Sequence, residues 1–259
     1  MSNVFDVSDK VAWITGASWG GLGYFHAKCL AEAGAHIIAT DLPSMTAELA
    51  EANARLESNN VTILTMPSDV TSEDDVQAVV NRADKEFGRL DVLVNNAGIG
   101  SDQPALDMPL RDWNHVLNVN LTGSWLCAKA VCHFMVKKEI RGKIINIASI
   151  YGRQADVDPA APYYATKAAI INLTRALAAE WARYGINVNA IGPGYFPTRM
   201  TREVEESPEL KRRFMERIML HRPGNPETDL RGTILLLASN ASDYITGQTI
   251  FVDGGWTAV

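Results

Sequence analysis

Short apolar strands alternate with amphipathic helices along this 259-residue chain, and no other feature constrains its fold as strongly. Runs rich in Val and Ile have the length and composition of buried strands. They are residues 11–15, 36–40, 61–65, 91–95, 143–148, 186–190 and 249–252. Helical periodicity occupies the intervening segments, and Gly34, Gly88 and Gly185 are expected to end three of them. The predicted helices are residues 22–33, 45–58, 72–87, 109–137, 161–183 and 227–238.

Connections of helical length between successive strands predict parallel strands joined by right-handed crossovers. The expected fold class is therefore α/β, a doubly wound Rossmann-type sheet of seven parallel strands with helices on both faces. No linker rich in Pro, Gly or Ser divides the chain, so we predict a single domain over residues 1–259. Residues 195–226 are proline-rich and interrupt the alternation of strands and helices. We expect them to form a substrate lid or a disordered loop.

Charge and composition exclude several classes of partner. The formal net charge of −6 disfavours nucleic acids and anionic membrane surfaces, which need a basic face. No stretch is long and apolar enough to span a bilayer, and the N-terminus lacks a signal-peptide pattern, so we expect a cytoplasmic protein. The cysteines and histidines show no spacing typical of disulfide frameworks or metal sites, so we predict no metal and buried thiols. The three cysteines are Cys29, Cys127 and Cys132.

A glycine-rich turn, Thr15-Gly-Ala-Ser-Trp-Gly-Gly-Leu-Gly23, follows the first predicted strand and leads into a helix. Glycines let the backbone approach a pyrophosphate closely, and the helix N-terminus offers free N–H groups. The turn therefore predicts a dinucleotide site that includes Gly16, Ser18, Gly21, Leu22 and Gly23.

Asp41 stands at the end of the second strand, about twenty residues beyond the glycines, where a carboxylate accepts hydrogen bonds from an adenosine ribose. Its charge would repel the 2′-phosphate of NADP, and neither Trp19 nor Leu42 supplies a cation. We therefore predict NAD as the cofactor, with NADP less favoured. In the alternative interpretation Asp41 only caps the following turn.

Tyr163 and Lys167 are four residues apart near the start of a predicted helix, so their side chains share one face. A phenol has a pKa near ~10 and is a poor base at neutral pH. A neighbouring ammonium and an oxidised nicotinamide favour the phenolate. Tyr163 is therefore the candidate general acid and base. Packing of both residues on an amphipathic helix is the alternative.

The motifs in this order resemble the short-chain dehydrogenase/reductase family over nearly the whole chain. Besides the features above, the resemblance rests on Asp69-Val70, Asn95-Asn-Ala-Gly98, Asn120, Ser149, Tyr163-x-x-x-Lys167, Pro193-Gly194 and Val252-Asp-Gly-Gly255. It implies a hydride-transferring oxidoreductase that acts on an alcohol or ketone, and a homotetramer.

The resemblance also implies roles for individual residues. Ser149 would orient the substrate oxygen, and Asn120 would hold a water that links Lys167 to solvent. Further residues implied to contact the cofactor are Asp69, Val70, Asn96, Ala97, Gly98, Pro193, Gly194, Phe196 and Thr198, together with Tyr163 and Lys167.

Two departures from the family pattern concern segment length. The glycine-rich turn has one residue more than usual, which leaves open whether Gly20 or Gly21 is the middle motif glycine. The segment between Ser149 and Tyr163 is also one residue longer, through residues 153–159. We expect the longer segment to alter contacts with the substrate rather than the catalytic reaction.

Substrate contacts are expected from residues 99–103, 150–154 and 195–222, because these follow the carboxyl ends of strands. Their polar side chains suit a polyol, sugar or sugar acid, and the C-terminal third resembles gluconate-type dehydrogenases. The basic run Lys211-Arg-Arg213 suits instead the phosphate of a 3-oxoacyl carrier thioester, or simply a solvated helix face.

Two other classes of function remain as alternatives. An extended-type epimerase would carry a further C-terminal substrate domain. A non-catalytic dinucleotide sensor would not need Ser149, Tyr163 and Lys167 together.

Overall fold

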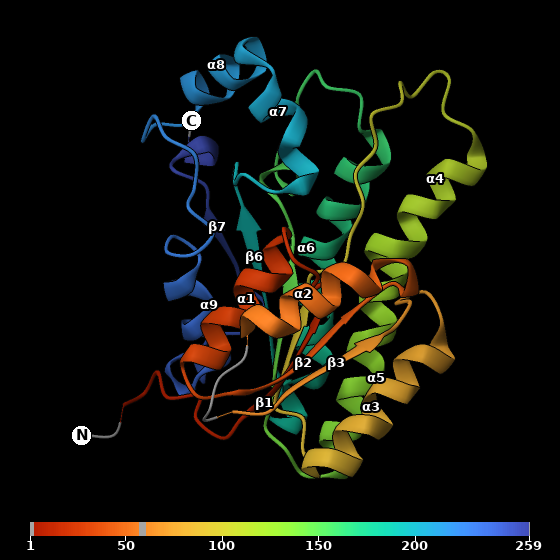
Figure 1. Ribbon diagram of the computed structural model, residues 1–259, viewed down its shortest axis with the longest axis vertical. Helices are drawn as coiled ribbons and strands as arrows, with labels where there is room; N and C mark the ends of the chain where they lie inside the picture. The colour runs from red at the N-terminus through yellow and green to blue at the C-terminus, as the bar shows by residue number, and fades with distance from the viewer. Residues whose placement is uncertain (1–2, 57–60, 259) are drawn as a thin grey trace.

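The computed structural model describes residues 3–56 and 61–258 and contains one seven-stranded parallel sheet (Figure 1). Its strand order is β3-β2-β1-β4-β5-β6-β7, and every neighbouring pair is parallel. The strands are β1 (Val11–Thr15), β2 (His36–Asp41), β3 (Ile63–Pro67), β4 (Val92–Asn95), β5 (Lys143–Ile147), β6 (Asn187–Pro193) and β7 (Thr249–Val252). The order reverses between β1 and β4, so the predicted doubly wound sheet is confirmed.

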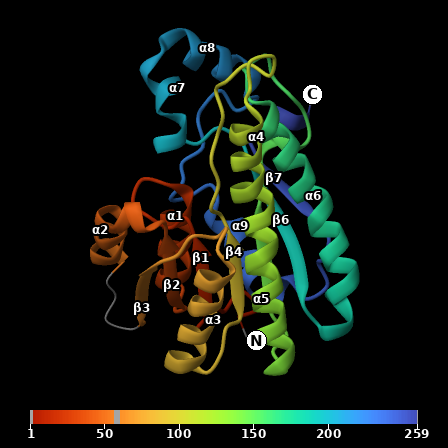
Figure 2. The same cartoon turned by 90° about the vertical axis from the view of Figure 1, so that its right-hand side faces the viewer.

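Helices cover both faces of this sheet (Figure 2). The α-helices are α1 (Leu22–Glu32), α2 (Thr46–Leu56), α3 (Glu73–Phe87), α4 (Leu110–Leu117), α5 (Ser124–Lys137), α6 (Ala161–Trp181), α7 (Arg202–Glu206), α8 (Pro208–Arg217) and α9 (Arg231–Ala238). One core cluster joins the sheet to α1, α2 and α9, and a second joins it to α3, α5 and α6.

Strand β1 shows how the pattern of residues builds both clusters. Ala12 and Ile14 pack into the first cluster, whereas Val11 and Trp13 pack into the second. All of β1 is buried, as expected of a central parallel strand covered on both faces.

Some predicted boundaries differ from those in the structure. The predicted strand 61–65 is displaced to β3, because the Thr62 N–H donates to the His36 imidazole and leaves the ladder irregular there. The helix expected from residue 227 starts at Arg231, because Asn225 and Asp229 first close a turn. Residues 57 and 58 of the predicted helix 45–58 lie outside the described residues.

The predicted helix 109–137 is interrupted. A π-helical turn, Asn118–Gly123, separates α4 from α5 and contains the buried Asn120. Such insertions are frequent at functional sites.

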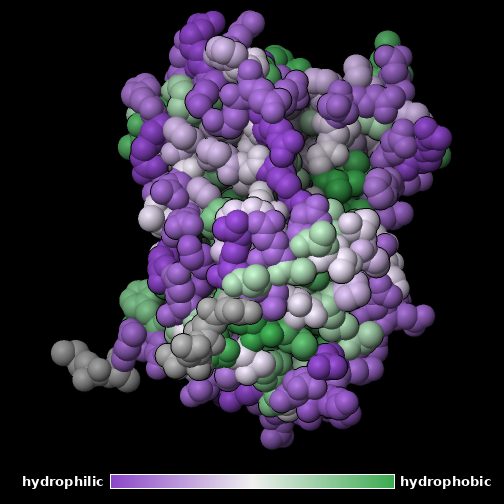
Figure 3. Space-filling model, in the orientation of Figure 1, coloured by the Kyte–Doolittle hydropathy of each residue, from purple (hydrophilic) through white to green (hydrophobic). Residues whose placement is uncertain are grey.

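The expected lid segment is ordered and partly helical. Helices α7 and α8 lie beyond the carboxyl end of β6 (Figure 1). Phe214 and Ile218 pack there against Tyr195 and Trp256. This end of the molecule is mainly hydrophilic on the face shown in Figure 3. Within the described residues, every helix is too short or too polar to cross a membrane.

Candidate active site

The glycine-rich turn between β1 and α1 requires two of its glycines for packing. Gly16 has φ +63°, and a Cβ there would lie 2.9 Å from the Cα of Ala97. A Cβ on Gly23 would lie 2.3 Å from the carbonyl oxygen of Gly16. The turn can therefore fold tightly against the loop after β4 only without these side chains.

Hydrogen bonds fasten the same turn to the loop after β4. The Asn96 amide donates to the carbonyl oxygens of Thr15 and Gly16, both at 2.9 Å. The Thr15 hydroxyl accepts from the N–H groups of Asn96 and Ala97, both at 3.0 Å. The role of Thr15 was not foreseen from the sequence, because a threonine that ends a strand resembles any other strand residue.

Several features of the turn fit a bound dinucleotide. The Ser18 hydroxyl oxygen is buried and has no hydrogen-bond partner in the described part of the chain. Among the described residues, no side chain caps the N-terminus of α1, and a Cβ on Gly21 would meet nothing closer than 3.7 Å. The turn thus offers a hydroxyl, free N–H groups and open space to a phosphate.

Asp41 ends β2, and its carboxylate is held by backbone donors. One oxygen accepts from the Ser18 N–H at 3.0 Å and the other from the Leu42 N–H at 2.9 Å. Asp41 therefore does cap the turn, as in the alternative interpretation. A carboxylate has about four acceptor positions, so it retains capacity for a ribose.

A cation that could not be located from the sequence lies beside Trp19 of the glycine-rich turn. The Arg55 guanidinium stacks on the Trp19 ring, 3.8 Å from its centroid, and pairs with Glu51 at 2.7 Å. Arg55 is on α2, so only the fold brings it beside the turn.

Asp69 and Val70 follow β3, as expected; Asp69 bonds to its own loop, whereas Val70 packs against the π-helical turn. The Asp69 carboxylate accepts from the N–H and hydroxyl of Thr71, both at 2.8 Å. Val70 is buried, and a Cβ on Gly123 would lie 2.6 Å from its side chain.

The predicted cofactor residues after β6 belong to a closely packed segment. A Cβ on Gly194 would lie 2.6 Å from the Cα of Asp253, which explains the glycine. Phe196 is buried in the first core cluster, so its side chain serves packing. Thr198 caps the turn at Arg199–Thr201.

Ser149 and Tyr163 meet at the carboxyl edge of the sheet. Ser149 follows β5 and caps the next turn by accepting from the Tyr151 N–H at 3.1 Å. Burial raises the pKa of the Tyr163 phenol, and a hydrogen bond with the Ser149 side chain opposes this shift. The Ser149 side chain therefore lies close enough to the Tyr163 phenol to influence its pKa.

Lys167 lies one turn beyond Tyr163 on α6, and its side chain is buried. Its ammonium nitrogen is 5.5 Å from the centroid of the Tyr163 ring and donates to the Ile147 carbonyl at 2.7 Å. Burial lowers the pKa of Lys167 to about 8. Burial thus disfavours both the ammonium and the phenolate.

Asn120 holds the loop after β4 against α6. Its side-chain oxygen accepts from the Ile99 N–H at 2.8 Å, and its amide donates to the Ile99 carbonyl at 3.0 Å. The amide also reaches the Thr166 hydroxyl at 3.1 Å. The π-helical turn therefore fixes the loop at Gly98, where an added Cβ would approach both Asn120 and Lys167.

Helix α8 is joined to residues 153–159, the segment that is one residue longer than usual. Arg217 pairs with Asp156 at 2.7 Å and stacks on the Trp256 ring, and Arg213 pairs with Asp158. The Asp156 side chain is only 6% exposed.

The basic run of α8 is paired within the protein. Lys211 contacts Glu205 at 2.8 Å, Arg212 contacts Glu216 at 3.0 Å, and Arg213 contacts Asp158. The pair of Arg212 and Glu216 is exposed, as expected of a solvated helix face, and each cation of the run already has a carboxylate partner.

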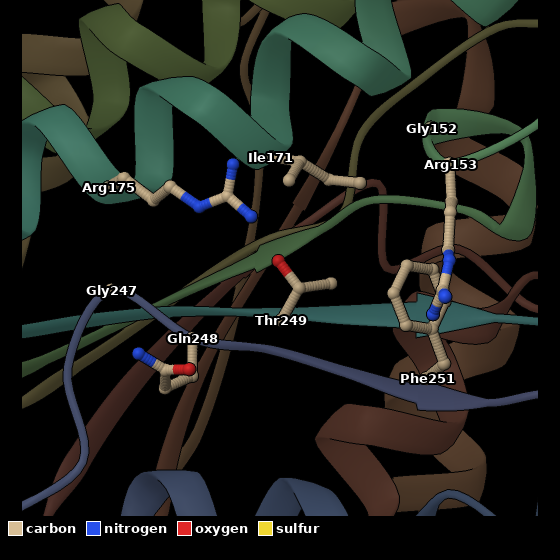
Figure 4. Close-up of a pocket in the computed structure, with 8 residues that line it drawn as sticks. All are labelled: Gly152, Arg153, Ile171, Arg175, Gly247, Gln248, Thr249 and Phe251. Carbon is tan, nitrogen blue, oxygen red and sulfur yellow. The ribbon is translucent and has the colours of Figure 1, made fainter.

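A groove of about 520 Å³ lies beside the predicted site, between α6 and the edge strand β7 (Figure 4). Arg175 projects from α6, and Arg153 lies over the Phe251 ring, 5.7 Å from its centroid. None of its lining residues is a predicted catalytic or cofactor residue.

Comparisons with known proteins agree with this arrangement. A family model described as enoyl-(acyl carrier protein) reductase matches residues 16–257. A 2-dehydro-3-deoxy-D-gluconate 5-dehydrogenase from Dickeya dadantii is 39% identical over 258 residues, which is 99% of this chain and 98% of that protein. A 3-oxoacyl-[acyl-carrier-protein] reductase from Synechocystis is 40% identical over 247 residues, 95% of this chain and 96% of that protein.

A solved structure supports the same relationship. The gluconate 5-dehydrogenase from Burkholderia cenocepacia, in complex with NADP and tartrate, is 36% identical and has a TM-score of 0.90. The match covers 99% of this chain and 98% of that one. Fold and site thus define an oxidoreductase of the nicotinamide-dinucleotide type. The chain belongs to the short-chain dehydrogenase/reductase family.

Proposed function

We propose that this protein is an NAD(H)-dependent dehydrogenase that interconverts a secondary alcohol of a sugar acid and the corresponding ketone. The observation that carries the proposal is the arrangement of Ser149, Tyr163 and Lys167: the Ser149 side chain influences the pKa of the Tyr163 phenol, and the buried Lys167 ammonium lies 5.5 Å from the centroid of the Tyr163 ring. The gluconate-type relatives support a sugar acid as the substrate class.

A nicotinamide dinucleotide supplies the hydride acceptor or donor, and the protein supplies every proton movement. In alcohol oxidation the Tyr163 phenolate accepts the proton of the substrate hydroxyl, and in reduction the phenol returns it to the carbonyl oxygen. Ser149 donates a hydrogen bond that orients the same oxygen. Lys167 favours the phenolate by its charge, which is effective because Lys167 is buried and Tyr163 is half-buried. Asn120 supports the water that exchanges protons with Lys167.

Residues of the turn and of the strand ends are suited to hold the dinucleotide. Ser18 and the N-terminus of α1 would hold the pyrophosphate, and Asp41 would accept hydrogen bonds from the adenosine ribose. Its negative charge favours NAD over NADP. In this proposal the chain is a single dinucleotide-binding domain with residues 195–226 as its lid, and it assembles as a homotetramer.

A buried amide supports a hydroxylated substrate. The Gln154 amide nitrogen lies five residues beyond Ser149 and has no hydrogen-bond partner in the described part of the chain. A buried donor without an acceptor is costly, and a substrate oxygen would satisfy it.

Reduced-nicotinamide absorbance during incubation with NAD and a panel of gluconate-type acids and polyols tests the reaction. We expect turnover with a sugar acid, its loss in Tyr163→Phe, and NADH binding that persists in that variant. Turnover of a 3-oxoacyl thioester alone would favour the reductase alternative, to which the Synechocystis relative points. NADH binding without turnover of any substrate would favour a sensor.

A further inference from the structure

The glycine-rich turn and the segment that leads into the lid touch at Gly20 and Arg199. The Arg199 N–H donates to the Gly20 carbonyl oxygen at 3.0 Å. A Cβ on Gly20 would lie 3.1 Å from the Cγ of Arg199 and 3.5 Å from its Nε. The arginine side chain therefore runs along the turn rather than away from it.

The contact occurs where the turn is longer than usual. Gly21 is the extended N-cap residue of α1, and so takes the place of the middle motif glycine at the helix start. Gly20 has φ +86°, in the left-handed region that favours glycine. We infer that Gly20 is the additional residue, and it is the residue that meets Arg199.

Local hydrogen bonds hold the backbone of Arg199 in place. The Thr201 hydroxyl donates to the Phe196 carbonyl at 2.8 Å and accepts from the Thr198 N–H at 2.9 Å. The Arg199 side chain is exposed and makes no salt bridge within residues 3–56 and 61–258. It thus differs from the paired basic residues of α8.

We propose that Arg199 is a pyrophosphate-binding residue of the cofactor site. A guanidinium presents several N–H donors in a planar fork that matches phosphate oxygens, and its charge complements a pyrophosphate. Ser18 and the N-terminus of α1 offer donors on the same turn. The inference rests on the proposed function, because it presumes that the turn binds a dinucleotide.

Binding measurements test this role without turnover. The dissociation constants of NADH and of ADP-ribose, which keeps the pyrophosphate but lacks nicotinamide, are measured by calorimetry for the wild type, Arg199→Gln and Arg199→Lys. We expect Arg199→Gln to raise both constants about tenfold, with a smaller rise in Arg199→Lys and a shallower salt dependence in Arg199→Gln. Arg212→Gln is the matched control, because this exposed arginine is paired with Glu216 on α8, and it should bind both ligands as the wild type does.

Other outcomes separate this inference from the proposed function. ADP-ribose binding that is equal in the wild type and Arg199→Gln would overturn the role of Arg199, even if NADH binding weakened. If Arg212→Gln weakened the binding of both ligands as much as Arg199→Gln does, the role of Arg199 would also be overturned, because the weaker binding would then reflect the change in net charge. Failure of the wild type to bind either ligand would reject the proposed function itself.

Discussion

Lys167 donates a 2.7 Å hydrogen bond from its ammonium nitrogen to the carbonyl oxygen of Ile147, across the interface between α6 and β5. Burial lowers the pKa of this ammonium from 10.5 to about 8. The protein thus keeps a cation where a neutral side chain would be more stable, as expected of a functional position.

Replacing this lysine should therefore stabilise the fold. Below pH 8 Lys167 is charged in both folded and unfolded states, and its burial costs roughly 3 kcal/mol, offset by about 2 kcal/mol from the hydrogen bond of its charged ammonium. Between about pH 8 and 10.5 the unfolded state binds more protons, so wild-type stability rises with pH in that window. We expect Lys167→Met to be inactive but more stable at pH 7, with an advantage that shrinks towards pH 10.5. Urea unfolding at both pH values measures this, and a less stable variant at pH 7 would contradict it.

His26 should control stability in acid. It is buried in α1, its Nε2 has no partner in the described residues, and burial lowers its pKa from 6.5 to about 4. The unfolded state therefore binds more protons between these values, and stability falls by up to roughly 3 kcal/mol as the pH drops from 6.5 to 4. We expect His26→Leu to flatten the dependence of the melting temperature on pH in this range. His133→Leu, at an exposed position of α5, should keep the wild-type dependence, and a steep dependence in His26→Leu would exclude His26 as the cause.

The sequence predicted the sheet well because its signals are local. Each strand is a short apolar run, and glycines with positive φ follow the helices where expected, as at Gly88 and Gly185. Boundaries were less accurate wherever a side chain competes with backbone hydrogen bonding. His36 shifts the start of β3, and the Asn225 and Asp229 side chains, which accept from the N–H groups of Glu227 and Asn225, delay the start of α9.

The sequence predicted which residues belong to the candidate site, but not the contacts between them. Spacing placed Tyr163 and Lys167 on one helix face, which the structure confirms. The sequence could not show that Arg55 reaches Trp19, because these contacts join segments that only the fold brings together. The expectation that Lys167 lowers the pKa of Tyr163 stays a prediction, because burial and Ser149 are the influences seen on the phenol.

The ion pair between Asp156 and Arg217 should hold the lid over the site. Asp156 is almost fully buried and also lies 3.5 Å from the Tyr151 hydroxyl. Asp156→Ala leaves Arg217 solvated, because its side chain is 38% exposed, but removes the hydrogen bonds of the Asp156 carboxylate with Arg217 and the Val157 N–H, so we expect stability to fall by about 1–2 kcal/mol. A loosened lid should also raise KM more than it lowers kcat.

Steady-state kinetics and thermal unfolding measure both effects. The matched control is Glu216→Ala, which breaks the exposed pair with Arg212 on the same helix. Exposed pairs contribute about 0–1 kcal/mol, so this variant should behave as the wild type. Unchanged KM in Asp156→Ala would show that the pair serves stability alone.

Asp41 and Arg55 should together determine the choice of dinucleotide. Asp41→Ala removes the charge that repels a 2′-phosphate, while Arg55 remains stacked on Trp19 beside the turn. We expect kcat/KM with NADP to rise about tenfold in Asp41→Ala, and kcat/KM with NAD to fall. Adding Arg55→Gln to this variant should remove much of the gain with NADP and leave the value with NAD unchanged, because only the 2′-phosphate needs the cation. If Asp41→Ala instead lowered both values equally, the carboxylate would act mainly by holding the backbone of Ser18 and Leu42, and the preference for NAD would need another source.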